Sequence, residues 1–227
     1  MSSETKDEKP ESKGLSTFTR RIIDINDLEK VLKKGVSHGL CGGHNLGNTC
    51  FMNSSIACLS NCTELTTYFL TNKYKSDINK KNKEGSGGKL AEAWKNLMDE
   101  YWNSSSRAGN PSKVKSIVGK KDSKFSGYGQ QDSNEFMTVF LSVLNEDLNK
   151  TDKKVYKELK EKGEDESELD CAKRFWNLHL QLNNSIITDL FSGLLKSEVQ
   201  CSNPNCQFKN ITFDPFNTLT LAFWFWK

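Results

Sequence analysis

Apolar residues recur at helical spacing over most of the first 193 positions of the chain. Side chains three or four positions apart lie on one face of an α-helix, so each such run predicts an amphipathic helix. The clearest run begins at Phe136 and ends at Leu148. Further helices are expected over residues 51–59, 90–101, 114–118 (ended by Gly119) and 175–182, with a short leader helix or strand plus helix over residues 22–32.

The apolar period changes to two from about residue 194 onward. Apolar or small residues at 195, 197, 199 and 201 alternate with Lys196, Glu198 and Gln200, which predicts a strand. A turn follows over residues 201–206, and two further strands are expected around residues 211–213 and 219–225. Helices followed by strands predict an α+β fold.

Polar segments separate these elements. Residues 1–13 are charged and rich in serine, so we expect them to be disordered. Residues 72–88 are rich in lysine and end in Gly-Ser-Gly-Gly, which predicts a flexible loop. Residues 149–170 mix lysine and glutamate with few apolar side chains, as in a surface insertion or a solvated helix. Residues 185–191 predict a short buried segment.

Composition narrows the classes of partner. A net charge of +3 over 227 residues does not favour nucleic acid. No apolar run reaches the roughly 18 residues that cross a membrane, so no membrane partner is expected. Seven cysteines, an odd number, in a chain without an apolar signal peptide at its start favour a reducing compartment. We therefore expect the cytoplasm, the nucleus or both.

Cys50 is the strongest candidate for a reactive group. It lies between a glycine-containing turn and the predicted helix that begins near Phe51. Free N–H groups and the positive end of the helix dipole would stabilise a thiolate there. The same N–H groups, together with the amide of Asn45, could bind a developing oxyanion. A buried structural cysteine is the alternative, because free cysteines are among the most buried residues.

Two carboxylates stand at the start of the predicted helix over residues 136–148. Asp132 precedes Glu135 by three positions, an arrangement that resembles a capping box. Helix capping alone would account for both residues.

Paired thiols raise the question of a metal. Cys201 and Cys206 flank a turn, and a gap of four residues fits metal-ligand spacing. No second pair follows them, so a zinc ion would be only half coordinated. Cys41 and His44 also have ligand-like spacing, but no partner pair lies near them in the sequence.

Two motifs resemble those of one enzyme family. The string Asn-Leu-Gly-Asn-Thr-Cys-Phe-Met-Asn-Ser at residues 45–54 resembles the cysteine box of the ubiquitin-specific proteases. Tyr-Gly-Gln-Gln-Asp-Ser-Asn-Glu-Phe at residues 128–136 resembles their second box. Residues 176–193 and 213–221 resemble the segments that close the helical lobe and begin the sheet.

The resemblance implies a papain-like cysteine protease fold. Residues 1–35 would be a disordered or leader segment, residues 36–193 the helical thumb, and residues 194–227 the start of the fingers sheet. The palm lobe would be absent. Asp132 and Glu135 would hold the arginine-containing C-terminal tail of ubiquitin, for which carboxylates are suited. Cys201 and Cys206 would be half of a structural zinc site.

The implied activity is hydrolysis of the peptide or isopeptide bond after the C-terminal glycine of ubiquitin. Cys50 would be the nucleophile and Asn45 the oxyanion-hole side chain, with no cofactor for catalysis. Ubiquitin and ubiquitinated proteins would be the partners.

The catalytic base is not evident among these residues. The family's histidine comes well downstream, whereas the histidines here are His38, His44 and His179. His179 falls inside a predicted helix and is expected to pack, and His44 is the first candidate for a substitute base. Our hypothesis is that the chain is a truncated or misjoined product of a longer deubiquitinase gene. The alternatives are a non-catalytic ubiquitin-binding or regulatory fragment and a small zinc-dependent interaction module.

Overall fold

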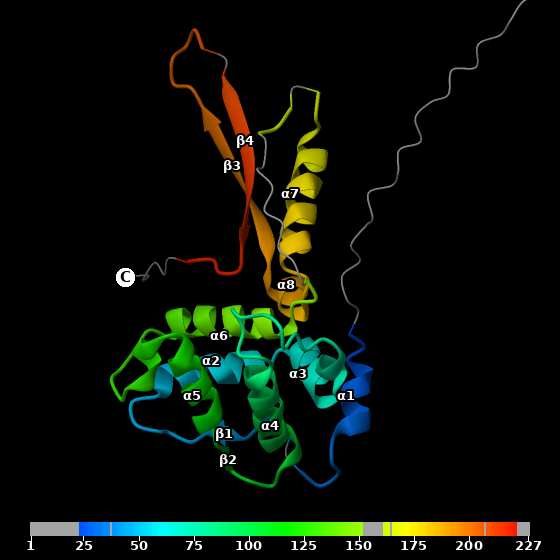
Figure 1. Ribbon diagram of the computed structural model, residues 1–227, viewed down its shortest axis with the longest axis vertical. Coiled ribbons are helices and arrows are strands. Elements are labelled where there is room, and N and C mark those ends of the chain that lie inside the picture. Colours follow the sequence, from blue (N-terminus) through cyan, green and yellow to red (C-terminus); the bar gives the residue numbers. More distant parts are fainter. Residues whose placement is uncertain (1–22, 37, 152–160, 164, 207, 222–227) are drawn as a thin grey trace, which may run out of the picture.

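The computed structural model describes residues 23–36, 38–151, 161–163, 165–206 and 208–221. It is a mixed structure of helices and small sheets, as the sequence predicts. Figure 1 shows a helical body from which one helix and one β-hairpin project on the same side. None of the helices in the described ranges has the length and apolar character needed to cross a membrane.

The helical body contains most of the apolar core. Its helices are α1 (Asn26–Val31), α2 (Cys50–Ser60), α3 (Thr63–Leu70), α4 (Lys89–Asn103), α5 (Ser112–Lys121), α6 (Ser133–Leu148) and α8 (Ile186–Phe191). Short 3-10 turns are η1 (Lys73–Ser76) and η2 (Ser123–Ser126), and β1 (Gly42–Gly43) pairs in parallel with β2 (Ala108–Gly109). The expected helices at residues 51–59, 90–101 and 136–148 are confirmed.

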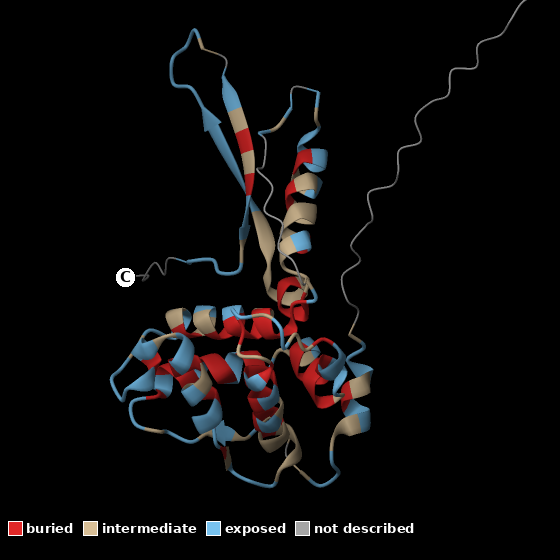
Figure 2. Ribbon diagram, viewed as in Figure 1, coloured by how far each residue is buried: buried red, intermediate tan, exposed pale blue. Residues whose placement is uncertain are grey.

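Aromatic rings link the helices of the body. Trp94 of α4 and Phe140 of α6 are fully buried, and their ring centroids lie 5.0 Å apart in an edge-on contact. Phe51 of α2 contacts Phe136 of α6 at 5.7 Å, also edge-on. Leu28 of α1 joins the same core, so the predicted leader helix packs on the body. Figure 2 shows the buried residues gathered where these helices face one another.

The projecting unit has its own small apolar cluster. Helix α7 (Glu168–Leu182) lies beside the antiparallel strands β3 (Gly193–Gln200) and β4 (Lys209–Phe216). Cys171 and Phe175 of α7 pack against Ile211 and Phe213 of β4. The period-two pattern of residues 195–201 therefore forms a strand as predicted. The strand around residues 211–213 is also confirmed.

Two expectations about element boundaries are wrong. No strand forms over residues 219–221, and residues 222–227 lie outside the described ranges. Gly119 does not end α5, which continues to Lys121. Its missing side chain instead makes room for η2, because a Cβ at Gly119 would lie 2.8 Å from Ser126 Oγ.

The expected flexible loop at residues 72–88 is instead held by the carboxylate of Asp147. Ser86 donates to Asp147 Oδ1 from its backbone N at 2.5 Å and to Oδ2 from its hydroxyl at 2.6 Å. Asn79 N donates to the Asp147 carbonyl at 2.8 Å. Asp147 is fully buried, so these bonds are shielded from water. The loop is ordered by a residue that lies about 60 positions later in the chain.

Part of the predicted insertion at residues 149–170 and all of the predicted disordered segment at residues 1–13 lie outside the described ranges. The division of the chain into thumb and fingers stays a prediction.

Candidate active site

Cys50 is the first residue of α2 and is exposed to solvent. The next two residues, Phe51 and Met52, are buried and anchor the first turn in the core. The first N–H groups of a helix have no partner within the helix. The thiol therefore stands at the first turn of a helix, as the sequence predicts.

The turn before Cys50 has an unusual backbone. Gly47 and Asn48 have φ values of 97° and 50°, both in the left-handed region. Glycine and asparagine adopt this region more readily than other residues. The side chain of Asn48 donates from Nδ2 to the Tyr128 carbonyl at 2.9 Å. This bond joins the cysteine turn to the second motif, at residues 128–136.

The amide of Asn45 has a defined orientation. Its Oδ1 accepts hydrogen bonds from Gly47 N at 3.0 Å, from Thr49 N at 3.3 Å and from Thr49 Oγ1 at 3.1 Å. Only the oxygen of an amide accepts, so these donors decide which end is the oxygen. The oxygen faces into the turn, and the Nδ2 donor group points away from these three donors.

Thr49 is a site residue that the sequence reasoning missed. Its side chain is completely buried, and its hydroxyl accepts from Leu46 N at 2.9 Å while donating to Asn45 Oδ1. It is therefore a positioning residue for the Asn45 amide. The available signal in the sequence was a threonine directly before the cysteine. The hydrogen-bond partners of its hydroxyl depend on the conformation of the turn, so the sequence does not reveal them.

Asn53 is a second residue that positions the cysteine turn. It lies within α2 and bonds back to the preceding segment. Its Nδ2 donates to the carbonyls of Gly43 at 3.3 Å and His44 at 3.2 Å. The close approach requires a residue without a Cβ at position 43, because a Cβ there would lie 2.8 Å from Asn53 Oδ1. This contact holds strand β1 against α2.

The start of α6 lies against the start of α2. Ser55 Oγ donates to the Ser133 carbonyl at 2.9 Å, which adds a polar link to the Phe51–Phe136 contact. Asp132 is the N-cap of α6, and its Oδ1 accepts from Glu135 N at 2.8 Å. The Glu135 carboxylate forms an ion pair with Lys124 rather than completing a reciprocal capping box. Capping by Asp132 is thus confirmed, and both carboxylates lie on the element adjoining the cysteine helix.

The histidines His38 and His44 lie in the segment that precedes the cysteine turn. His38 Nδ1 lies 2.6 Å from the Trp102 carbonyl. His44 follows β1, its backbone N donates to the Gly109 carbonyl at 2.9 Å, and its side chain is exposed. Within the described ranges, which include all three histidines, no hydrogen bond joins a histidine to Cys50.

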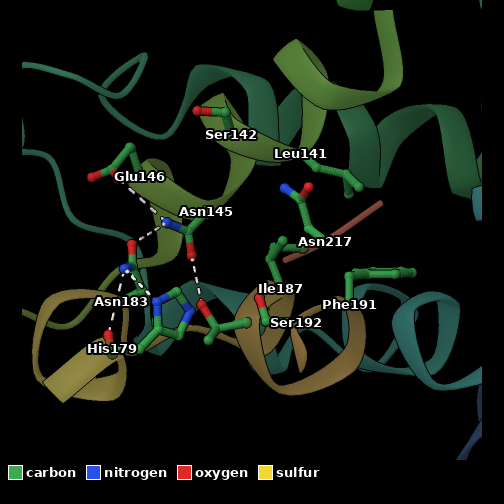
Figure 3. A pocket seen from close by; sticks show the side chains of 11 residues that line it. Leu141, Ser142, Asn145, Glu146, His179, Asn183, Ile187, Phe191, Ser192 and Asn217 are labelled. Carbon is green, nitrogen blue, oxygen red and sulfur yellow. Dashed lines mark hydrogen bonds between the residues drawn. The ribbon is translucent and has the colours of Figure 1, made fainter. Parts of the chain in front are cut away.

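His179 packs inside α7, as predicted. Its ring stacks on Trp176 with centroids 5.4 Å apart, and burial lowers the pKa of the imidazole. Figure 3 shows the ring beside a cavity of about 180 Å³, near Asn183 and Asn145. The Nε2 atom is buried and has no hydrogen-bond partner. The cavity lies between α6, α7 and α8, at the junction of the body and the projecting unit.

Cys201 and Cys206 meet at the tip of the β3–β4 hairpin. A hydrogen bond from the Asn203 backbone and one from the Cys206 thiol hold the pKa of Cys201 below its usual value. Two such thiols are half of a tetrahedral zinc set. Among the residues described, no group of three or more histidine, cysteine, aspartate or glutamate side chains could hold a metal ion. These residues alone therefore do not complete a zinc site, and the half-site stays a prediction.

Comparison with known proteins identifies the family. Residues 41–221 match the sequence profile of the ubiquitin carboxyl-terminal hydrolase family. Ubiquitin carboxyl-terminal hydrolase 4 of Pongo abelii is 45% identical over 186 residues, which cover 82% of this chain and 19% of the relative. Ubiquitin carboxyl-terminal hydrolase 15 of Homo sapiens is 44% identical over 183 residues, which cover 81% of this chain and 18% of the relative. The chain thus spans about a fifth of the length of these relatives.

Solved structures share the fold. The SAGA Ubp8/Sgf11/Sus1/Sgf73 DUB module bound to ubiquitin aldehyde contains a chain that superimposes with a TM-score of 0.54 at 21% identity. The match covers 82% of this chain and 36% of that one. Both boxes, at residues 45–54 and 128–136, and most of the described fold lie within the region matched by the family profile. The chain belongs to the ubiquitin carboxyl-terminal hydrolase family, and it corresponds to the N-terminal part of the catalytic domain of a ubiquitin-specific protease.

Proposed function

We propose that this chain supplies the nucleophile and the oxyanion donors of a thiol-dependent deubiquitinase. The observation that carries the proposal is the geometry of the cysteine turn. An exposed thiol begins α2, and the Asn45 amide is held with its oxygen inward and its donor group free to face a substrate.

The proposed reaction is acyl transfer from ubiquitin. The Cys50 thiolate attacks the carbonyl carbon of the C-terminal glycine, and the developing oxyanion accepts from Asn45 Nδ2 and from backbone N–H groups at the start of α2. The C–N bond breaks, the leaving amine takes a proton, and water hydrolyses the thioester. The base that takes the thiol proton and returns it to the amine would be a histidine other than the three in these 227 residues.

The Asp132 and Glu135 carboxylates are proposed to hold the arginine-containing tail of ubiquitin. Paired hydrogen bonds between carboxylate and guanidinium suit this role. Their place at the start of α6, which packs on the start of α2, supports it.

The test separates the nucleophile from the base. A C-terminal aldehyde on ubiquitin forms a hemithioacetal with a positioned thiol and does not require a general base to remain bound. We expect the chain to bind ubiquitin aldehyde at least ~10-fold more tightly than it binds ubiquitin, and Cys50→Ala to abolish that difference. Equal affinity for the two ligands would contradict the proposed nucleophile.

A second candidate function is ubiquitin binding without catalysis. It is favoured by the absence of any described hydrogen bond between a histidine and Cys50. Hydrolysis of a fluorogenic ubiquitin C-terminal amide distinguishes the two functions. Turnover that is lost in Cys50→Ala supports catalysis by this chain, and binding without turnover supports the second function.

A further inference from the structure

A basic, open cavity lies beside the cysteine turn. It has a volume of about 520 Å³ and is lined by one face of α5 together with Leu46 and Tyr128. Leu46 belongs to the turn between Asn45 and Cys50, and the Tyr128 carbonyl accepts the Asn48 side chain. A ligand in this cavity would therefore contact the turn that positions the thiol.

The charged groups that line the cavity are both lysines. Lys115 and Lys120 face it, and no aspartate or glutamate is among the lining residues. Helix α5 carries four lysines and no acidic residue in its ten positions. The remaining polar groups are hydroxyls, from Tyr128 and from serines at positions 112, 116 and 126, of which Ser126 already donates to the Gly119 carbonyl at 2.8 Å. Ammonium and hydroxyl donors together suit an anionic ligand with several oxygen acceptors.

The two lysines differ in how they are held. Lys115 Nζ donates to the carbonyls of Ser126 at 3.1 Å and Gly127 at 2.7 Å, and it lies 5.4 Å from the centroid of the Tyr128 ring. These contacts hold one positive charge in place at the cavity wall. Lys120 is exposed, and the described part of the chain gives it no ion pair or hydrogen bond. Its ammonium group is available to a ligand.

We propose that this cavity binds an acidic peptide segment of the protein conjugated to ubiquitin. The basic tail of ubiquitin would be repelled by Lys115 and Lys120, whereas it suits the carboxylates at the start of α6. An acidic segment near the modified lysine of the conjugated protein would instead be attracted by Lys115 and Lys120. The shape and charge of the cavity do not depend on the proposed function. Only the identification of its ligand with a ubiquitinated protein rests on that function.

Binding is tested with a fluorescein-labelled octaglutamate peptide and fluorescence anisotropy. We expect the peptide to bind, octaglutamine not to bind, and the affinity to fall as salt rises. Lys120→Glu should weaken binding at least ~10-fold. Lys113→Glu is the matched control, because Lys113 is an exposed lysine on the same helix that does not line the cavity. A change of less than about 2-fold is expected for it.

A chloroacetyl group on the same peptides tests whether the bound peptide lies beside the Cys50 thiol. We expect the glutamate peptide to alkylate Cys50 at least ~10-fold faster than the glutamine peptide, because binding raises the local concentration of the electrophile. Mass spectrometry separates Cys50 from Cys58, an exposed thiol that serves as the internal reference. Lys120→Glu should remove the acceleration. Because hydrolysis is not measured, this result is independent of catalysis by the chain.

Three outcomes would overturn the proposal. Equal weakening by Lys113→Glu and Lys120→Glu would mean that α5 attracts anions through its net charge alone. Competition by inorganic phosphate, without binding of the glutamate peptide, would assign the cavity to a phosphate group instead. Equal alkylation of Cys50 by the two peptides would place the bound peptide away from the thiol.

Discussion

Individual hydrogen bonds fix the geometry of the cysteine turn. The orientation of the Asn45 amide depends on donors supplied by Gly47 and Thr49, and one of them is a buried hydroxyl. An oxyanion donor is effective only when it is held in place before charge develops. Thr49 would therefore contribute to the proposed oxyanion site through Asn45, without facing the substrate.

Replacing Thr49 with valine tests this role. Thr49→Val keeps the shape of the side chain, removes the donor to Asn45 and leaves Leu46 N–H unpaired, at a cost of about 1–3 kcal/mol in stability. We expect the affinity for ubiquitin aldehyde to fall ~10-fold or more while the affinity for unmodified ubiquitin is retained. Thr49→Ser should restore the affinity for ubiquitin aldehyde. Parallel losses for both ligands would indicate a purely structural role.

The ring of His179 makes stability depend on pH. Burial lowers its pKa in the folded chain, whereas the unfolded chain titrates near the ordinary value of about 6.5. As the pH falls below ~6.5, the unfolded state takes up the proton first, so the free energy of unfolding decreases. Above that pH the ring is neutral in both states, so it adds no pH dependence to the free energy of unfolding. The loss is complete only below the folded pKa.

Urea unfolding at pH 7.5 and pH 5.5 measures this effect. Between pH 7.5 and pH 5.5, we expect the free energy of unfolding to decrease less in His179→Phe than in the wild-type chain. His44→Phe, which alters an exposed ring, should show the wild-type decrease. Glu146, the carboxylate that lines the same cavity, is present in all three proteins. An unchanged decrease in His179→Phe would rule out the buried imidazole as its source.

At the scale of elements, the first turn of α6 combines a structural and a proposed functional role. Asp132 caps the helix, and the capping bond requires only an acceptor oxygen. Contact with a guanidinium group requires the charge as well. The two roles can therefore be separated by substitution.

Asp132→Asn should leave stability nearly unchanged, because asparagine caps helices about as well as aspartate. Asp132→Ala should cost about 0.5–2 kcal/mol in urea unfolding. We expect both variants to weaken ubiquitin binding by ~10-fold or more, as measured by calorimetric titration. Wild-type affinity in Asp132→Asn would show that the carboxylate charge makes no contact with ubiquitin.

Periodic elements could be predicted from the sequence because their signals are local. The apolar faces of α4 and α6 and the alternation in β3 each depend on residues within one element. The order of residues 72–88 could not be predicted, because it comes from Asp147, which the sequence gives no reason to pair with Ser86. The failure at residues 219–221 has a related origin, since an alternating pattern forms a strand only where a partner strand is available.

The site was partly predictable for the same reason. Cys50, Asn45 and the Asp132 cap stand in continuous motifs with recognisable spacing. Thr49 and Asn53 act through bonds that exist only once the turn has folded, and composition cannot indicate them. The cavity on α5 combines residues from three separate segments, so no single stretch of sequence points to it.

At the scale of the whole molecule, two apolar clusters divide the described chain. The body contains the larger one, and α7 with the hairpin contains a cluster of four buried residues, Cys171, Phe175, Ile211 and Phe213. A cluster of that size buries little area, so the projecting unit should open locally more readily than the body.

Phe213→Ala should loosen the projecting unit selectively. Replacing a buried phenylalanine costs about 3–5 kcal/mol, and Phe213 retains only 8% exposure. We expect faster hydrogen exchange in β3, β4 and α7, with protection of α2 and α4 retained. Leu195→Ala, at a residue of the same hairpin that is 47% exposed, is the matched control and should have little effect. Equal loss of protection in α4 would show one cooperative unit.

The buried carboxylate of Asp147 has a consequence for the order in which the chain acquires its structure. Helix α4 begins after Gly88, and Ser86 Oγ accepts from its Leu90 N at 2.8 Å. The N–H groups of Leu90 and Ala91 also donate to Asp147 Oδ2 at 3.2 and 3.4 Å, and Asp147 in turn holds Ser86. During synthesis, α4 therefore leaves the ribosome before the carboxylate that completes its cap exists. We expect its first turn to stay frayed until α6 has been made and has docked, so that the interior of the body closes from its C-terminal side.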